Sequence, residues 1–174
     1  GRFFVLKEEI EQVGTLDDYL AKVESGEICP EPLVLRANAG DCVEVRLTNL
    51  LPEFLEESPF QLKTLTDIVG FHIHLVKFDT IVSDGAANGA RRCETLVERF
   101  FANEELHAVF FHDHLFANVH QQHGLFGALI VEPAGAKFLD PHTGEPLKRG
   151  TQAVIRTADG KVFREFVLFC HDFA

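Results

Sequence analysis

Two pairs of histidines are the residues of this chain with the clearest capacity for chemistry. His72 and His74 form one His-x-His pair, and His112 and His114 form a second, which begins 40 residues after the first. Both pairs lie among apolar and aromatic residues typical of β-strands. Because residues i and i+2 of a strand point to the same face, each pair presents two imidazoles side by side. Neutral imidazole is a very common metal ligand, so the spacing predicts a metal site.

The spacing alone leaves the metal open. Zinc takes three or four ligands, which two His-x-His pairs can supply. Non-haem iron prefers a carboxylate beside two histidines, and Asp79, Asp84 and Asp113 are candidates for it. A purely structural role would require hydrogen-bond partners for four buried imidazoles, which is a costly arrangement. We therefore favour metal binding over a structural role.

The elements that must position these histidines are short strands. Val43, Val45 and Leu47 alternate with polar residues and follow a turn at 38–41. Further strands are expected at 33–35, 69–78, 94–101, 107–112 and 125–132, with turn-rich sequence between them. Short strands at this spacing indicate an all-β sandwich or barrel rather than a series of βαβ units.

Composition divides the chain into three parts. Residues 1–30 form an N-terminal extension, in which Thr15 and Asp18 resemble a capping box and predict one short helix. Residues 31–135 carry the expected strands and form one domain. Residues 136–174 form a connector and then, from about residue 162, the first strand of a following domain. Since Met is absent, also at position 1, we expect the chain to be a piece of a longer protein.

Charge and cysteine usage exclude several classes of function. A net charge of -11 argues against nucleic acid or an anionic membrane as the main partner, and it favours the approach of cations. No apolar stretch approaches the length of a membrane span. The four cysteines show no C-x-x-C spacing, so a structural zinc ribbon is not expected, and their disulfide state stays open: Cys29, Cys42, Cys93 and Cys170.

The sequence around the second pair resembles the first cupredoxin domain of multicopper oxidases. About ten residues after His114 comes the run GLFGALIV at 124–131, which matches Gly-Leu-x-Gly-x-Leu-Ile-Val of that family. The run GDCVEVRLTN at 40–49 is similar to the family's Gly-Asp-x-Val-x-Val-x-Leu-x-Asn strand pair. The resemblance covers about residues 32–133, and it implies a cupredoxin-like Greek-key β-sandwich that binds copper.

The resemblance also implies a role for each histidine. His72 corresponds to the ligand of a type 2 copper, and His74, His112 and His114 correspond to ligands of the type 3 pair. Asp84, ten residues after His74, matches the acid that supplies protons to this trinuclear cluster. Reduction of O2 to two waters consumes four electrons and four protons, so an acid near the metals is useful. The alternative for Asp84 is a turn-forming aspartate before glycine.

The chain is expected to supply half of such a centre and to lack a blue copper site. Related copper modules carry a cysteine thiolate where this chain has Asp113, and no Met is present as an axial ligand, so no blue copper site is expected here. The other half of the cluster would come from a second cupredoxin domain, in the same protein or a neighbouring subunit. Leu75 also departs from the glycine that commonly follows the first pair in the family.

We therefore expect half of the trinuclear copper cluster of a multicopper oxidase, which couples one-electron oxidation of a donor to reduction of O2. The isolated chain is expected to be inactive, and the family's usual location implies a place outside the cytoplasm. The alternatives are a non-catalytic copper-binding or copper-delivery module, and a mononuclear zinc or iron enzyme on a β-sandwich. The donor, a phenol or a metal ion, stays open.

Two further features carry no assigned function. The loop with Glu53, Glu56 and Glu57 is compatible with oxidation of a metal ion, although such a loop is more often just a solvated surface. His120 and His123 lie between the second pair and the glycine-rich run, and their role stays open.

Overall fold

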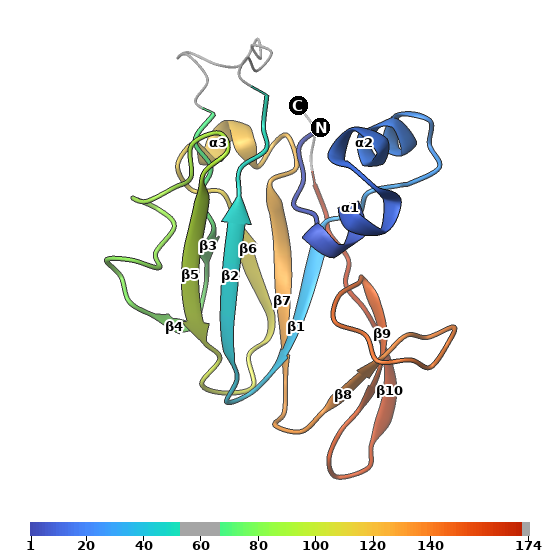
Figure 1. The fold of residues 1–174 in the computed structure, drawn as a ribbon. Helices are drawn as coiled ribbons and strands as arrows, with labels where there is room; N and C mark the ends of the chain where they lie inside the picture. The colour runs from blue at the N-terminus through green and yellow to red at the C-terminus, as the bar shows by residue number, and fades with distance from the viewer. Residues whose placement is uncertain (53–66, 172–174) are drawn as a thin grey trace.

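The structure is a computed structural model that describes residues 1–52 and 67–171 (Figure 1). The acidic loop that carries Glu53, Glu56 and Glu57 lies outside the described residues. No helix in the described ranges is both long and apolar enough to cross a bilayer.

The first histidine of each pair belongs to a four-stranded sheet in which the strand order is β1-β7-β6-β3. Its strands are β1 (Leu33–Asn38), β7 (Phe126–Glu132), β6 (His107–His112) and β3 (His72–Ile73). β1 runs parallel to β7, whereas the β7-β6 and β6-β3 pairs are antiparallel. The apolar run that resembles the cupredoxin motif is therefore an interior strand, and it is almost entirely buried.

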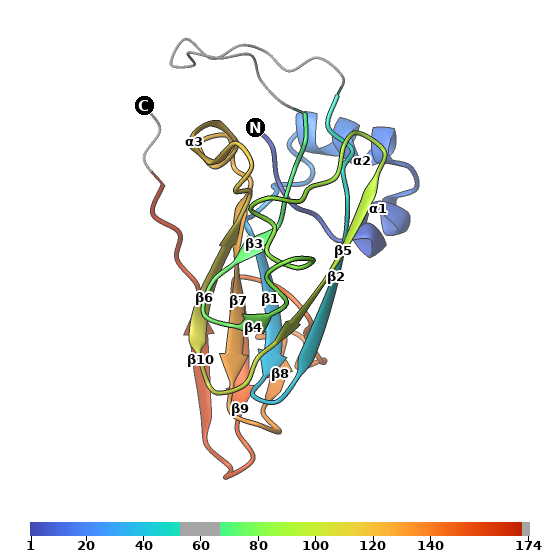
Figure 2. The ribbon, with the colours of Figure 1, turned by 90° about the vertical axis from the view of Figure 1, so that its left-hand side faces the viewer.

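A second sheet faces the first, with the order β2-β5-β4 (Figure 2). It comprises β2 (Cys42–Thr48), β5 (Thr95–Phe101) and β4 (Lys77–Phe78). The turn at 38–41 carries the chain from β1 in one sheet to β2 in the other, and the backbone N–H of Asn38 donates to Asp41 Oδ2 (2.8 Å). The expected all-β sandwich is confirmed.

Aromatic side chains fill the space between the two sheets. Phe71 stacks on Phe111 with a centroid distance of 4.4 Å, and it also contacts Phe100 at 5.9 Å and Phe4 at 5.6 Å. Burial of a phenylalanine contributes about 1.5–3 kcal/mol, so this cluster is a main source of stability. Phe71 and Phe111 each directly precede the first histidine of a pair, and the same packing therefore holds both pairs in place.

The N-terminal part contains two helices, α1 (Lys7–Val13) and α2 (Leu16–Glu24). α2 is the expected helix, and its capping box is present: Asp18 N–H donates to Thr15 Oγ1 (3.2 Å) and Thr15 N–H donates to Asp18 Oδ2 (3.0 Å). The sequence did not predict α1, which lacks a side-chain cap and ends at Gly14. The extension also sends Phe4 into the core.

The C-terminal part forms a third sheet at the lower right of Figure 1, with the order β10-β9-β8. Its antiparallel strands are β8 (Lys137–Leu139), β9 (Gln152–Arg156) and β10 (Val162–Phe166). The strand expected from about residue 162 is present, but two strands precede it where a connector was expected. Arg36 on β1 contacts Glu165 on β10 (2.6 Å), which links this sheet to the sandwich.

Candidate metal centre

Strand pairing brings the two histidine pairs together. His72 is the register partner of His112 in the antiparallel β3-β6 pair, and the N–H of His74 donates to the carbonyl of Phe110 (3.1 Å). The four imidazole rings consequently form one cluster. The ring centroids of His72 and His114 are 4.8 Å apart, and those of the other contacting rings are 5.1–5.5 Å apart. β3 ends at Ile73 and β6 ends at His112, so the second histidine of each pair lies just beyond the strand that carries the first.

Three of the four histidines form the tightest group. The ligand atoms of His72, His74 and His112 all lie within 4.8 Å of one another, and the Nε2 atoms of His74 and His112 are 3.1 Å apart. The ring of His114 stacks on His112 at an interplanar angle of 30°, but its nitrogens are not part of that group. His112 is buried, His72 is half-buried, and His74 and His114 are exposed, so the cluster opens to the surface.

Backbone carbonyls orient two of the rings. His72 Nδ1 lies 2.6 Å from the carbonyl oxygen of Asp84, and His112 Nδ1 lies 2.8 Å from that of Asp113. The side-chain amide of Gln121 also lies 2.8 Å from His112 Nδ1. Because a carbonyl oxygen can only accept, the Nδ1 of His72 carries the proton and its Nε2 keeps the lone pair. His112 Nδ1 lies between a carbonyl acceptor and an amide NH2 donor, so these contacts hold its ring in place without setting its tautomer. Fixing the tautomer through the second ring nitrogen is how proteins prepare imidazoles as metal ligands.

Burial also favours the neutral form of the imidazole. It lowers the pKa of His74 below the ordinary value, and the neighbouring rings of His72 and His114 lower it further. Burial lowers the pKa of His112 in the same way, and nearby imidazoles add to the effect, although the hydrogen bond to the Asp113 carbonyl opposes it. Neutral imidazole is the form that binds a metal ion.

Close backbone contact holds Asp84 beside the cluster. Its Oδ1 lies 3.7 Å from His72 Nδ1, and its side chain is partly exposed. Gly85 follows at φ 66°, and a Cβ there would collide with the backbone of Phe71 and the amide nitrogen of His72. Only glycine therefore allows the loop this close to β3. The turn-forming and acid-supplying interpretations of Asp84 are thus compatible.

Asp113 is fully buried, and its side chain does not join the cluster. Its Oδ1 accepts from the N–H of Gly70 (2.7 Å), while Oδ2 accepts from the N–H of Phe116 (3.0 Å) and lies 2.8 Å from Nδ1 of the buried His120. The backbone before the first pair is therefore tied to the residue inside the second pair. Asp113 serves as a structural link rather than as the iron ligand considered from the sequence.

His120 was not predicted as part of this link. It lies in the short helix α3 (Ala117–His120), and its side chain is fully buried beside Asp113. The signal available in the sequence was an aspartate between two histidines followed by a histidine seven residues later, but many folds could satisfy that spacing. The ring of His123 instead contacts the carbonyl of Val119 (2.6 Å).

Leu75, which directly follows the first histidine pair, has a strained backbone conformation. Its φ is 62°, in the left-handed region where glycine is favoured, and its side chain is 70% exposed. The leucine keeps that conformation at a cost of about 1–2 kcal/mol.

The cysteines play no part in the cluster. Cys29, Cys42, Cys93 and Cys170 are all exposed free thiols, and the three-membered ligand group contains histidines alone. The described residues therefore offer imidazole nitrogens, and no thiolate, at the candidate centre.

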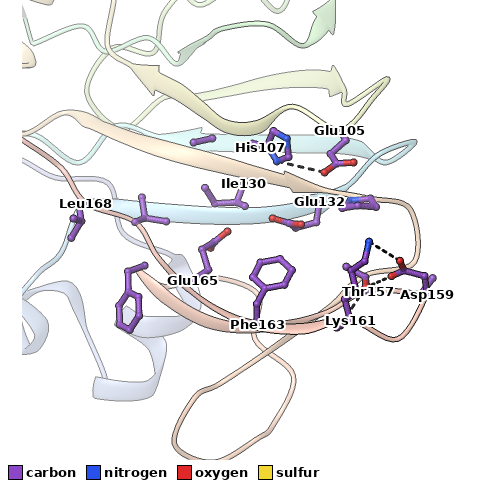
Figure 3. A pocket seen from close by; sticks show the side chains of 15 residues that line it. Glu105, His107, Ile130, Glu132, Thr157, Asp159, Lys161, Phe163, Glu165 and Leu168 are labelled. Atoms are coloured by element: carbon purple, nitrogen blue, oxygen red, sulfur yellow. Dashed lines mark hydrogen bonds and ion pairs between the residues drawn. The ribbon is translucent and has the colours of Figure 1, made fainter.

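A separate pocket of about 770 Å³ lies at the other end of β6 (Figure 3). Glu105, Glu132 and Glu165 line it, and His107 Nδ1 lies 3.5 Å from Glu105 Oε1. His107 and His112 are five residues apart on one strand, which corresponds to roughly 17 Å. The pocket is therefore distinct from the histidine cluster.

Comparison with known proteins finds similarity in solved structures. No family model matches the chain, and no curated protein matches its sequence. The chain is similar to a copper nitrite reductase from Nitrosomonas europaea, with 24% identity and a TM-score of 0.41. It is also similar to Fet3p, a multicopper oxidase that functions in iron import (19%, TM-score 0.46), and to Lac15 from a marine microbial metagenome (20%, TM-score 0.42).

These matches are partial. They cover 61%, 63% and 72% of this chain, which in turn spans 32%, 19% and 34% of the matched chains. At such identities and TM-scores the likeness carries no conclusion about chemistry, which rests on the geometry of the histidines. All three TM-scores are below 0.5, so the description of the fold rests on the strand order and packing of this chain itself.

Proposed function

We propose that this chain is the copper-binding domain of a multicopper oxidase and holds half of an oxygen-reducing copper cluster. The observation that supports this most directly is the β3-β6 register, which pairs His72 with His112 and gathers four imidazoles. In the proposed assignment His72 is the type 2 ligand, and His74, His112 and His114 are type 3 ligands.

The donor set fits copper. The Nδ1–H group of His72 is held by the Asp84 carbonyl, and the Nε2 atoms of His74 and His112 face each other at 3.1 Å. Imidazole nitrogen suits copper in both of its common oxidation states, and it also suits zinc. The described cluster contains neither a thiolate nor a carboxylate that would favour a blue copper or an iron site.

In this proposal the histidines would bind the copper ions, and Asp84 would act beside them. When bound, copper ions would supply the one-electron steps that together deliver four electrons to O2. The four imidazoles would hold these ions at the open surface of the cluster, and the Asp84 carbonyl orients the ring of His72. In the proposed assignment Asp84, whose Oδ1 lies 3.7 Å from the same ring, would be the acid that supplies protons to the cluster.

The proposal requires a second cupredoxin domain, because the cluster lacks a blue copper site and half of its copper ligands. Electrons would enter through a blue copper elsewhere, since all four cysteines are exposed and outside the cluster. The exposed His74 and His114 face the side on which a second cupredoxin domain, of the same protein or a neighbouring subunit, would add its ligands. O2 would be the electron acceptor and a phenol or metal ion the donor, in an extracytoplasmic protein.

Copper titration of the chain tests the proposal. We expect the chain to bind copper weakly, with imidazole nitrogen coupling in the electron paramagnetic resonance spectrum and no blue absorption band. His112→Ala should reduce copper affinity at least about tenfold, which is the loss that even an outer partner of a ligand produces. His142→Ala, at an exposed histidine outside the cluster, is the matched control and should leave affinity unchanged.

Metal analysis of the full-length protein separates the alternatives. About four copper ions per chain agrees with the proposal, whereas a single zinc or iron ion contradicts it. A blue band from this chain alone, or copper binding that survives His112→Ala, would also contradict it. Full copper loading without oxidase activity would identify a binding or delivery module instead.

A further inference from the structure

The pocket of about 770 Å³ lies between the outer face of β6 and β7 and the strand β10 (Figure 3). Figure 3 shows the side chains of Phe163 and Glu165 rising from β10 toward those of Ile130 and Glu132 on β7. Sites for small molecules commonly have volumes of roughly 300–1,000 Å³, with an apolar lining and a few polar groups that orient the ligand. The space between the two sheets is therefore large enough for a small organic molecule.

Glu132, the only charged residue of β7, lines this pocket. It is 5% exposed, although a buried strand normally carries an apolar residue at such a position. Burial raises the pKa of Glu132, and the carboxyl group of Glu165, with which it shares a hydrogen bond, raises it further, whereas His107 opposes the rise. Burial of an acid is costly unless a proton or a positive charge compensates it.

The other acids that line the pocket each have a basic neighbour. These pairs are Glu165–Arg36 at 2.6 Å, Asp159–Lys161 at 2.9 Å and Glu105–His107 at 3.5 Å. In the part of the chain that the structure describes, no such pair involves Glu132, and its hydrogen-bond partner Glu165 already contacts Arg36. The pocket therefore keeps one carboxyl group available for a cation.

A second acceptor without a partner lies beside Glu132. Asn38 on β1 is the register partner of Glu132, and register partners of neighbouring strands direct their side chains to the same face of the sheet. The side-chain NH2 of Asn38 donates to the carbonyl of Ala136 (3.2 Å), whereas its Oδ1 is buried without a hydrogen-bond partner among the described residues. Because both groups accept hydrogen bonds, a matching ligand carries donors and a positive charge.

The rest of the lining favours an organic cation over a metal ion. Ile130, Phe163, Phe166 and Leu168 give the pocket apolar walls, and an aromatic ring attracts a cation over its face. The volume of the pocket is far larger than a single ion requires. Within residues 1–52 and 67–171, the acids of the pocket do not form a group of three metal-ligand atoms within 4.8 Å of one another, as three of the histidines do.

We propose that this pocket binds a small organic cation, with its ammonium or amidinium group at Glu132 and its apolar body between Ile130 and Phe163. The cation takes the place of the proton that the buried carboxyl group otherwise requires. The site lies at the opposite end of β6 from the histidine cluster, roughly 17 Å away along the strand. It therefore goes beyond the proposed function and does not require copper.

Titration of the metal-free chain with phenethylammonium, followed by calorimetry and methyl NMR, tests the proposal. We expect a Kd below about 1 mM, with shifts of the Ile130 methyl signals and none at the histidine cluster. Phenethyl alcohol has the same shape without the charge, and it should bind at least about tenfold more weakly. Equal binding of the two probes overturns the proposal, as does binding of Ca²⁺ or Mn²⁺ at the pocket without binding of the amine.

Substitutions locate the cation within the pocket. Glu132→Gln should lower the affinity for phenethylammonium at least about tenfold, whereas Glu145→Gln, at an exposed acid outside the pocket, should leave it unchanged. Phe163→Leu, at a half-exposed position, should lower it about two- to fivefold, and it provides the test if Glu132→Gln does not fold. An affinity that survives these changes contradicts the proposed site. Copper binding should be the same in all three variants, so a chain that binds the amine and no copper contradicts the proposed function alone.

Discussion

The burial of Glu98, a residue of β5 that is 1% exposed, predicts a pH dependence of stability that does not depend on any metal. Its pKa is about 8 in the folded chain and near 4.5 when the side chain is exposed to water. Between these values the folded chain keeps the proton and the unfolded chain releases it. The free energy of unfolding therefore falls as the pH rises from about 4.5 to about 8, and above that range Glu98 adds no further change.

The magnitude follows from the size of the shift. A rise from 4.5 to about 8, at about 1.4 kcal/mol per pH unit, gives a ceiling of about 5 kcal/mol. Relaxation and water entry around an ionised side chain reduce such ceilings, so we expect about 2–4 kcal/mol. Glu98→Gln keeps the shape and removes the ionisation. It should therefore match the original chain within about 1 kcal/mol at pH 5 and exceed its stability by about 2–4 kcal/mol at pH 9.

Urea unfolding of the metal-free chains, followed by circular dichroism at a series of pH values, measures this difference. Burial also raises the pKa values of Glu9 and Glu132, but these groups are present in both proteins and cancel in the comparison. Glu104→Gln serves as the exposed control. A difference between Glu98→Gln and the original chain that is the same at pH 5 and pH 9 would refute the reasoning.

Three other substitutions test how the site is held. Asp113→Asn places an amide group where the carboxylate accepts three hydrogen bonds. Urea unfolding should show a free energy of unfolding lower by about 2–3 kcal/mol, and copper binding should weaken. Unchanged stability would contradict the linking role. Leu75→Gly should raise stability by up to about 1 kcal/mol in a thermal melt, because glycine adopts φ 62° without strain, whereas a loss would contradict the strain. Gly85→Ala should lower both copper affinity and stability, because a Cβ would push the Asp84 loop away from His72. A fully stable variant with unchanged copper affinity would show that the close approach of the loop is dispensable.

Local patterns were enough to predict most of the strands. Alternation along Val43, Val45 and Leu47 corresponds to β2, and the apolar run at 126–132 corresponds to β7. The Thr15 capping box also formed as expected. These features depend on a few neighbouring residues, whose side-chain direction follows from strand or helix periodicity. The helix α1 was missed because it has no side-chain cap.

Long-range contacts decided the remaining features of the site. Glu98 appears in the sequence as one charged residue of a strand, and its burial depends on the facing sheet and the Asp84 loop. The partners of Asp113 likewise come from segments 43 residues earlier and seven residues later in the chain. Residue type and spacing do not specify such partners.

From the sequence by itself, the period of a strand predicts that each His-x-His pair presents two imidazoles on one face. In the structure His72 and His112 lie in strands, whereas His74 and His114 lie just beyond them. The sequence also determined, through the motifs around the pairs, that a cupredoxin-like sandwich was the fold to expect. Only the tertiary structure decided that His72 lies opposite His112 and that Asp84 and the buried Glu98 lie behind them. The physical reason is that strand register and loop packing depend on contacts between distant segments, whereas side-chain direction depends on the local backbone.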